Sequence, residues 1–130
     1  MQHKCGYIKE YYDMNNKYIK KEYFQNNDII EGEYKSYYKN GNIKEEAYYI
    51  NGKLNGIYKI YYENGNLWIE INYIYGKKNG VKKTYNCNGD LLEELNYLDD
   101  KLHGICKIYN IWFDNTEKII NYCNGQKIKN

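Results

Sequence analysis

The sequence contains no arginine and no proline, and alanine, valine and serine each occur once. It has no apolar stretch of membrane-spanning length, so it predicts no transmembrane helix. Its 19 lysines are balanced by 17 acidic residues, which leaves a net charge of +2. This balance argues against an acidic nucleic-acid mimic, a strongly basic binder and a membrane-surface protein. The first residues are charged and aromatic rather than apolar, so we expect no signal peptide and a cytoplasmic protein.

The residue types that usually support catalysis or metal binding are scarce. The cysteines stand singly at positions 5, 87, 106 and 123, and histidine occurs only at positions 3 and 103. No Cys-x-x-Cys pair is present, so we expect free thiols and neither a metal site nor a cofactor. The paired carboxylates of Glu45-Glu46 and Glu93-Glu94 would point to opposite faces of a strand and could not act jointly. The sequence therefore predicts a protein that is not an enzyme and has no catalytic residues.

Tyrosine and asparagine are abundant and follow a repeat of 24 residues. Glycine, lysine and tyrosine recur at this interval at positions 32, 56, 80 and 104, at positions 35, 59, 83 and 107, and at positions 37, 61, 85 and 109. A longer, degenerate copy opens the chain, and the last copy carries one extra residue near Trp112. We therefore predict one domain over residues 1–130, with repeats at 6–31, 32–55, 56–79, 80–103 and 104–127.

Each repeat holds two short segments separated by turn signals. Asn-Gly at 40–41, 64–65 and 88–89 predicts two-residue type I′ turns, in which both central residues need positive φ. The sequence therefore predicts an all-β fold, a single-layer antiparallel meander of about ten short strands built from about five 24-residue hairpins, elongated and curved. The expected strands cover 7–12, 18–24, 32–38, 43–49, 56–62, 67–73, 80–86, 91–97, 104–110 and 117–123.

This register places opposite charges directly across the strands. With two-residue loops, Lys35, Lys59 and Lys83 face Glu46, Glu70 and Glu94. On the same face, Tyr37, Tyr61 and Tyr85 are expected opposite Lys44, Trp68 and Leu92. The other face is expected to hold the packed interior, with a row of aromatic rings at Phe24, Tyr49, Tyr73, Tyr97 and Tyr122.

The unit resembles the MORN repeat and its bacterial variant class. The matching segments are residues 37–45, 51–56 and 61–67, and residues 101–104 match the Gly-Lys-x-His-Gly core with Asp100 in place of the first glycine. The resemblance covers about residues 6 to 127 and implies an elongated, curved sheet with an aromatic-lined groove. Many bacterial members are labelled antitoxins of the YwqK type, and other proteins with such repeats are scaffolds or bind partner proteins.

These features favour a non-catalytic protein-binding module. Within that class we expect a small inhibitor, either an antitoxin or immunity protein or a phage-encoded inhibitor, that blocks a bacterial toxin or nuclease. Tyrosine and tryptophan are enriched at interface hot spots. The expected contact residues are Tyr37, Tyr61, Trp68, Tyr85, Leu92, Tyr109 and Trp112.

Two alternatives remain open. Open sheet edges would suit a scaffold or oligomerisation module, including a homodimer. Tyrosine and lysine could also hold single-stranded nucleic acid, although arginine is absent and the lysines face glutamates.

Overall fold

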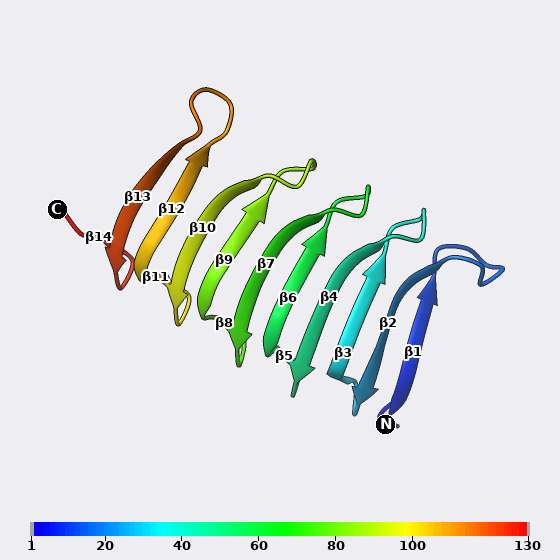
Figure 1. Cartoon of the computed structure of the whole chain (residues 1–130). Helices are drawn as coiled ribbons and strands as arrows, with labels where there is room; N and C mark the ends of the chain where they lie inside the picture. Colours follow the sequence, from blue (N-terminus) through cyan, green and yellow to red (C-terminus); the bar gives the residue numbers. More distant parts are fainter. Residues whose placement is uncertain (1, 130) are drawn as a thin grey trace.

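The computed structural model describes residues 2–129, and within them fourteen strands form one open antiparallel sheet without helices (Figure 1). No helix in this range is long and apolar enough to cross a membrane. The ten longer strands are β1 (Gly6–Tyr11), β2 (Ile19–Asn26), β3 (Ile29–Tyr37), β4 (Ile43–Ile50), β6 (Gly56–Tyr61), β7 (Leu67–Ile74), β9 (Gly80–Tyr85), β10 (Leu91–Leu98), β12 (Gly104–Asn110) and β13 (Thr116–Cys123). The predicted single-layer meander is confirmed.

The four additional strands are short continuations of the hairpins. They are β5 (Lys53–Leu54), β8 (Lys77–Lys78), β11 (Lys101–Leu102) and β14 (Gln126–Lys127). Each of the first three is separated from the next long strand by one residue, such as Asn55, whose N–H donates to the Tyr48 carbonyl at 2.8 Å. The following Gly56 has a φ of 108°, a conformation that favours glycine. This interruption explains why the sheet has more than the ten expected strands.

The two ends of the hairpins carry different turns. Asn51 and Gly52 both have positive φ, 49° and 75°, as a two-residue type I′ turn requires. At the opposite end only Gly41 has positive φ, and its N–H donates to the Tyr38 carbonyl at 3.0 Å. This is a three-residue loop with a type I turn followed by a left-handed glycine. The prediction of two-residue type I′ turns at 40–41, 64–65 and 88–89 is therefore wrong.

The longer loop introduces a β-bulge beside it. Tyr37, Tyr61 and Tyr85 lie opposite Ile43, Leu67 and Leu91, not opposite Lys44, Trp68 and Leu92 as predicted. Beyond the bulge the predicted register returns, and Lys35, Lys59 and Lys83 lie opposite Glu46, Glu70 and Glu94. The second strand of each of these hairpins has one extra residue at the bulge, directly after the first residue pair beside the loop.

A single layer leaves little of the chain fully buried. In residues 2–129 the buried hydrophobic side chains are Ala47, Ile71 and Cys106. Ala47 and Ile71 lie on the face that also carries Tyr34, Tyr49, Tyr58 and Tyr73, here called the tyrosine face. Ring contacts at 5.9 Å join Tyr34 to Tyr23 and to Tyr49.

Phe24 does not join this row. Its ring instead contacts Tyr7 at 5.1 Å. A bulge between Tyr23 and Phe24 in the longer first repeat changes which residue faces the row, so the predicted placement of Phe24 is wrong.

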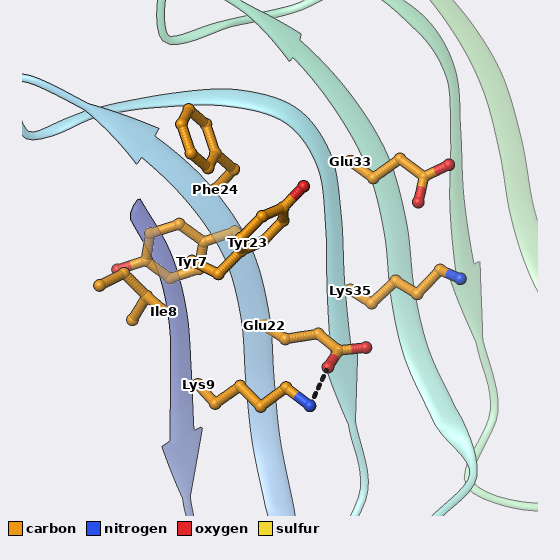
Figure 2. Close-up of a pocket in the computed structure, with 8 residues that line it drawn as sticks. All are labelled: Tyr7, Ile8, Lys9, Glu22, Tyr23, Phe24, Glu33 and Lys35. Carbon is orange, nitrogen blue, oxygen red and sulfur yellow. Dashed lines mark ion pairs between the residues drawn. The ribbon is translucent and has the colours of Figure 1, made fainter. Parts of the chain in front are cut away.

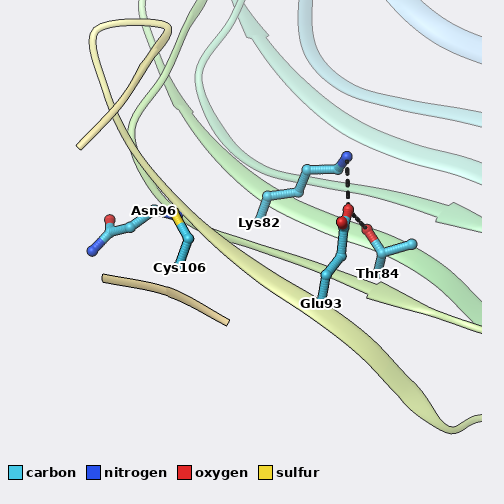
Figure 3. A network of polar contacts seen from close by, with 5 residues as sticks. All are labelled: Lys82, Thr84, Glu93, Asn96 and Cys106. Carbon is cyan, nitrogen blue, oxygen red and sulfur yellow. Dashed lines mark hydrogen bonds and ion pairs between the residues drawn. The ribbon is translucent and has the colours of Figure 1, made fainter. Parts of the chain in front are cut away.

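Polar groups on the tyrosine face are paired with one another. Figure 3 shows Glu93 accepting a hydrogen bond from Thr84 at 2.9 Å and pairing with Lys82 at 3.5 Å. In the next hairpin Cys106 is 1% exposed, and its Sγ accepts the Asn96 N–H at 3.3 Å. The tyrosine face is thus a satisfied interior surface rather than an open row of charges.

Candidate protein-binding surface

The opposite side of the sheet, here called the Lys–Glu face, carries one alternating row of charges. The row crosses nine successive long strands through Lys9, Glu22, Lys35, Glu46, Lys59, Glu70, Lys83, Glu94 and Lys107. Ion pairs form at 3.6 Å between Lys9 and Glu22 and at 3.8 Å between Lys59 and Glu70. Neighbouring charges of opposite sign cancel, so the row produces little net field.

The predicted tyrosine stripe runs beside this row, and three of its four hydroxyls donate hydrogen bonds to glutamates of the row. The hydroxyls of Tyr37, Tyr61 and Tyr109 donate to Glu22, Glu46 and Glu94 at 2.7, 2.6 and 2.7 Å. Tyr85 occupies the same repeat position, and all four side chains are half-buried. The three bonded tyrosines therefore connect their hairpins to the preceding strand.

The environment of Tyr37, Tyr61 and Tyr109 raises the pKa of their hydroxyls. Burial raises the pKa of Tyr37 to about 12, and the hydrogen bond to Glu22 contributes in the same direction. Burial and the bond to Glu46 likewise raise the pKa of Tyr61. For Tyr109 the hydrogen bond to Glu94 is the main reason that the pKa rises. These phenols are consequently donors at neutral pH and not bases.

Trp68 and Leu92 lie at bulge positions next to the three-residue loops. Trp68 is 39% exposed and stacks on the Tyr62 ring at 5.1 Å. The Tyr62 hydroxyl donates to the Tyr85 carbonyl at 2.8 Å, and this bond fixes the ring on which the indole stacks. Leu92 is half-buried in β10. Trp68 thus offers one rigid aromatic surface at this end of the hairpins.

Trp112 lies at the same end, in the loop between β12 and β13. It is 75% exposed, and the neighbouring Phe113 is 90% exposed. The loop is longer than the three-residue loops, as the extra residue near Trp112 led us to expect. One whole hairpin, β9–β10, separates Trp112 from the hairpin of Trp68. The predicted contact residues therefore form a stripe and two separate aromatic points, not one cluster.

A row of exposed apolar side chains on the Lys–Glu face was not predicted. Ile57, Val81 and Ile105 are 49%, 43% and 56% exposed, and Tyr48 at 48% lies beside them. Each of the three aliphatic residues directly follows a repeat glycine, Gly56, Gly80 or Gly104. The 24-residue spacing contained this signal, since the positions are apolar in three consecutive copies. We call Tyr48, Ile57, Val81 and Ile105 the apolar row.

The N-terminal end of the same face contains a pocket of about 260 Å³ (Figure 2). Tyr7, Phe24, Lys9 and Glu22 line it, and Tyr7 is 85% exposed. In the described part of the chain no three His, Cys, Asp or Glu side chains come together in a way that could hold a metal ion. The pocket is an apolar hollow edged by an ion pair.

The family model of the MORN repeat variant matches residues 30–51 and 54–75. The second and third of the five hairpins match the MORN repeat variant. These segments contain most of β3–β4 and all of β6–β7. MORN repeats are non-catalytic modules associated with binding. No curated protein matches the chain at a significant level.

Proposed function

We propose that the protein is a non-catalytic protein-binding module and that its partner lies on the apolar row of the Lys–Glu face. The observation that carries the proposal is the exposure of Ile57, Val81 and Ile105 at the same position of three consecutive hairpins. Asn72 lies beside Ile57 and Asn96 beside Val81 on the intervening strands. The row therefore offers a strip of apolar side chains on alternate strands, separated by amides, to a partner that desolvates it. The paired charges beside the strip give it a polar rim.

A more specific proposal is that the partner is a bacterial toxin or nuclease that the protein inhibits. Its support is the resemblance of the repeat to the bacterial variant class that includes antitoxins. The exposed aromatics Trp68 on one hairpin and Trp112 with Phe113 on another supply two further contact points at the loop end of the hairpins. Tryptophan is the residue type most enriched among interface hot spots.

Affinity capture from nuclease-treated lysate, followed by mass spectrometry, identifies the partner and provides the assay. Val81→Lys and Ile105→Lys should each weaken the measured affinity by about tenfold or more, because a charge enters the desolvated strip. Met14→Lys is the matched control, since Met14 is fully exposed and belongs to the β1–β2 turn. Unchanged affinity in both row variants, with folding intact, would contradict the proposed surface.

Lys59→Ala separates this proposal from nucleic-acid binding. Lys59 pairs with Glu70, so its removal should leave affinity for a protein partner nearly unchanged. If capture yields nucleic acid in untreated lysate only, and Lys59→Ala weakens it with a steep salt dependence, the protein-binding proposal is wrong. Capture of a toxin or nuclease would support the inhibitor, whereas another protein would support only the binding module.

A further inference from the structure

The two ends of the sheet carry different halves of the repeat. β1 lies at one end and the β12–β13 hairpin with β14 at the other (Figure 1). β1 is hydrogen-bonded only to β2 within residues 2–129. In the same range β13 pairs with β12 along its length and with β14 only through Tyr122 and Cys123. Each end thus has an open strand edge.

β1 is a complete first strand of a hairpin. Gly6, Lys9 and Tyr11 match Gly56, Lys59 and Tyr61 in β6 at the same spacing. Lys9 lies opposite Glu22 as Lys59 lies opposite Glu70. Inside the sheet such a strand pairs on its other side with the second strand of the preceding hairpin. For β1 no strand of the described residues occupies that side.

β13 is a complete second strand. Its end pairs with β14 through Tyr122 and Lys127, as Tyr49 in β4 pairs with Leu54 in β5. Four internal junctions show what such a strand pairs with next. Glu22 lies opposite Lys35, Glu46 opposite Lys59, Glu70 opposite Lys83 and Glu94 opposite Lys107. In β13 the position of these glutamates is held by Ile119. Ile119 pairs with Lys107 of β12 within its own hairpin, as Glu94 pairs with Lys83.

We propose that β1 of one molecule pairs antiparallel with β13 of a second molecule, so that copies of this chain join head to tail. The register of the internal junctions places Lys9 opposite Ile119 of the second copy and Glu10 opposite its Lys118. The sheet then continues across the junction with the order of strands unchanged. The occupant of each edge is the other end of the same chain.

Charge complementarity supports this pairing. The four internal junctions place Lys21, Glu45, Ile69 and Glu93 opposite Ser36, Ile60, Thr84 and Ile108, and none of these pairs joins opposite charges. Only at the two ends does the position hold Glu10 and an exposed Lys118. Glu10 already pairs with Lys21 at 3.2 Å. At the junction Lys118 of the second copy would approach this carboxylate from the other side.

The apolar neighbours fit the same register. Ile120 holds the repeat position of Ile71, which is 2% exposed where strands flank it on both sides. Ile120 has β12 on one side only and is half-buried. The next pair of the junction places Ile8 of β1 beside Ile120, where it would supply the missing cover. Such a contact joins two different surfaces and does not close on itself, so it builds open-ended chains rather than a symmetric dimer.

Sedimentation velocity over a concentration series of the full chain tests the proposal. The wild type should give a progressive series of oligomers whose mean mass rises with concentration. Glu10→Lys places lysine opposite Lys118, and Lys118→Glu places two carboxylates together, so each variant alone should associate about tenfold more weakly. An equimolar mixture restores opposite charges at every mixed junction and should recover association.

Circular dichroism melting of each variant checks that the hairpins remain folded. Lys77→Glu, at an exposed position of β8, provides a charge reversal away from both edges. Recovery in the mixture but in neither variant alone would support head-to-tail pairing, because a loss of folding could not be rescued by mixing. A wild type that stays monomeric throughout the series would overturn the proposal, as would a single closed dimer. Variants that associate as the wild type does would also overturn it, and so would a mixture that behaves like its components.

Discussion

The central hairpin β6–β7 and the C-terminal hairpin β12–β13 follow the same repeat, yet their burial differs. Ile71 in β7 is 2% exposed, whereas Ile120, at the same repeat position in β13, is half-buried. β7 has a long strand on each side, and β13 has one only on the β12 side. A strand in this sheet therefore owes its burial to its neighbours as much as to its own side chains.

The loops of the two hairpins differ in the same way. In the loop of β6–β7, Asn64 and Asn66 both donate to the Cys87 carbonyl of the next loop, at 2.9 and 2.8 Å. In the loop of β12–β13, Asp114 accepts hydrogen bonds from Thr116, the first residue of β13. Successive central loops thus brace one another, while the C-terminal loop leaves Trp112 exposed. The regular repeats provide stability, and the last hairpin presents side chains to solvent.

Replacing Ile71 and Ile120 by alanine is the strongest test of this comparison. Ile71→Ala should lower the free energy of unfolding by about 3 kcal/mol, because the strands on both sides leave a cavity that can relax only partly. Ile120→Ala should cost about 1 kcal/mol, since its side chain is only half-buried. Urea denaturation measures both values.

The control for this pair is the urea dependence itself. If both variants keep the wild-type slope, the two free energies report on the same unfolding reaction. Equal losses for Ile71→Ala and Ile120→Ala would contradict the claim that neighbouring strands supply the burial. In that case the C-terminal hairpin must be covered by something else in solution, including a second copy at concentrations where the chain associates.

The loops give a smaller contrast. Gly65 has a φ of 93°, and an added Cβ would meet Asn42 at an ordinary 3.6 Å. Gly65→Ala should therefore cost about 1 kcal/mol from backbone strain alone. Gly89→Ala, with a φ of 92° and open space around it, is the matched control and should cost the same.

Trp112→Ala should change stability by only a few tenths of a kcal/mol. A larger loss for Trp112→Ala would show that its ring packs against the sheet.

The sequence predicted the repeating parts of this molecule well. Glycine, lysine and tyrosine at 24-residue intervals located the hairpins, and the opposition of Lys59 and Glu70 located the register. These features are repeated several times, so independent copies support one another. The departure from the repeat at Trp112 was also located, because the last copy carries one extra residue there.

Features that depend on one residue of loop length could not be predicted. Asn-Gly suits a two-residue turn and also the end of a three-residue loop, and only the backbone distinguishes them. That difference moved Trp68 to a bulge and placed Leu67 opposite Tyr61. Phe24 was misplaced because its repeat is longer than the others. The apolar row was overlooked because tyrosine and tryptophan were taken as the better contact residues.

The tyrosine hydroxyls provide the smallest contrast, and it depends on pH. Tyr61 and Tyr109 make the same hydrogen bond, to Glu46 and Glu94, but burial is the main cause of the raised pKa only for Tyr61. An unfolded tyrosine ionises near its ordinary pKa of 10.0, whereas folded Tyr61 keeps its proton to higher pH. The stabilisation is therefore complete below about pH 10 and is lost as the pH rises towards the folded pKa.

Tyr61→Phe should therefore lower the free energy of unfolding by about 1 kcal/mol at neutral pH, through loss of the bond to Glu46. The decline in stability above about pH 10 should also become shallower than in the wild type, because one proton that the folded state retains has been removed. Tyr109→Phe should change both quantities less, and urea midpoints across alkaline pH would measure them. If Tyr109→Phe changed the alkaline decline as much as Tyr61→Phe does, the hydrogen bond rather than burial would control both phenols. The central and C-terminal hairpins would then be equivalent in this respect.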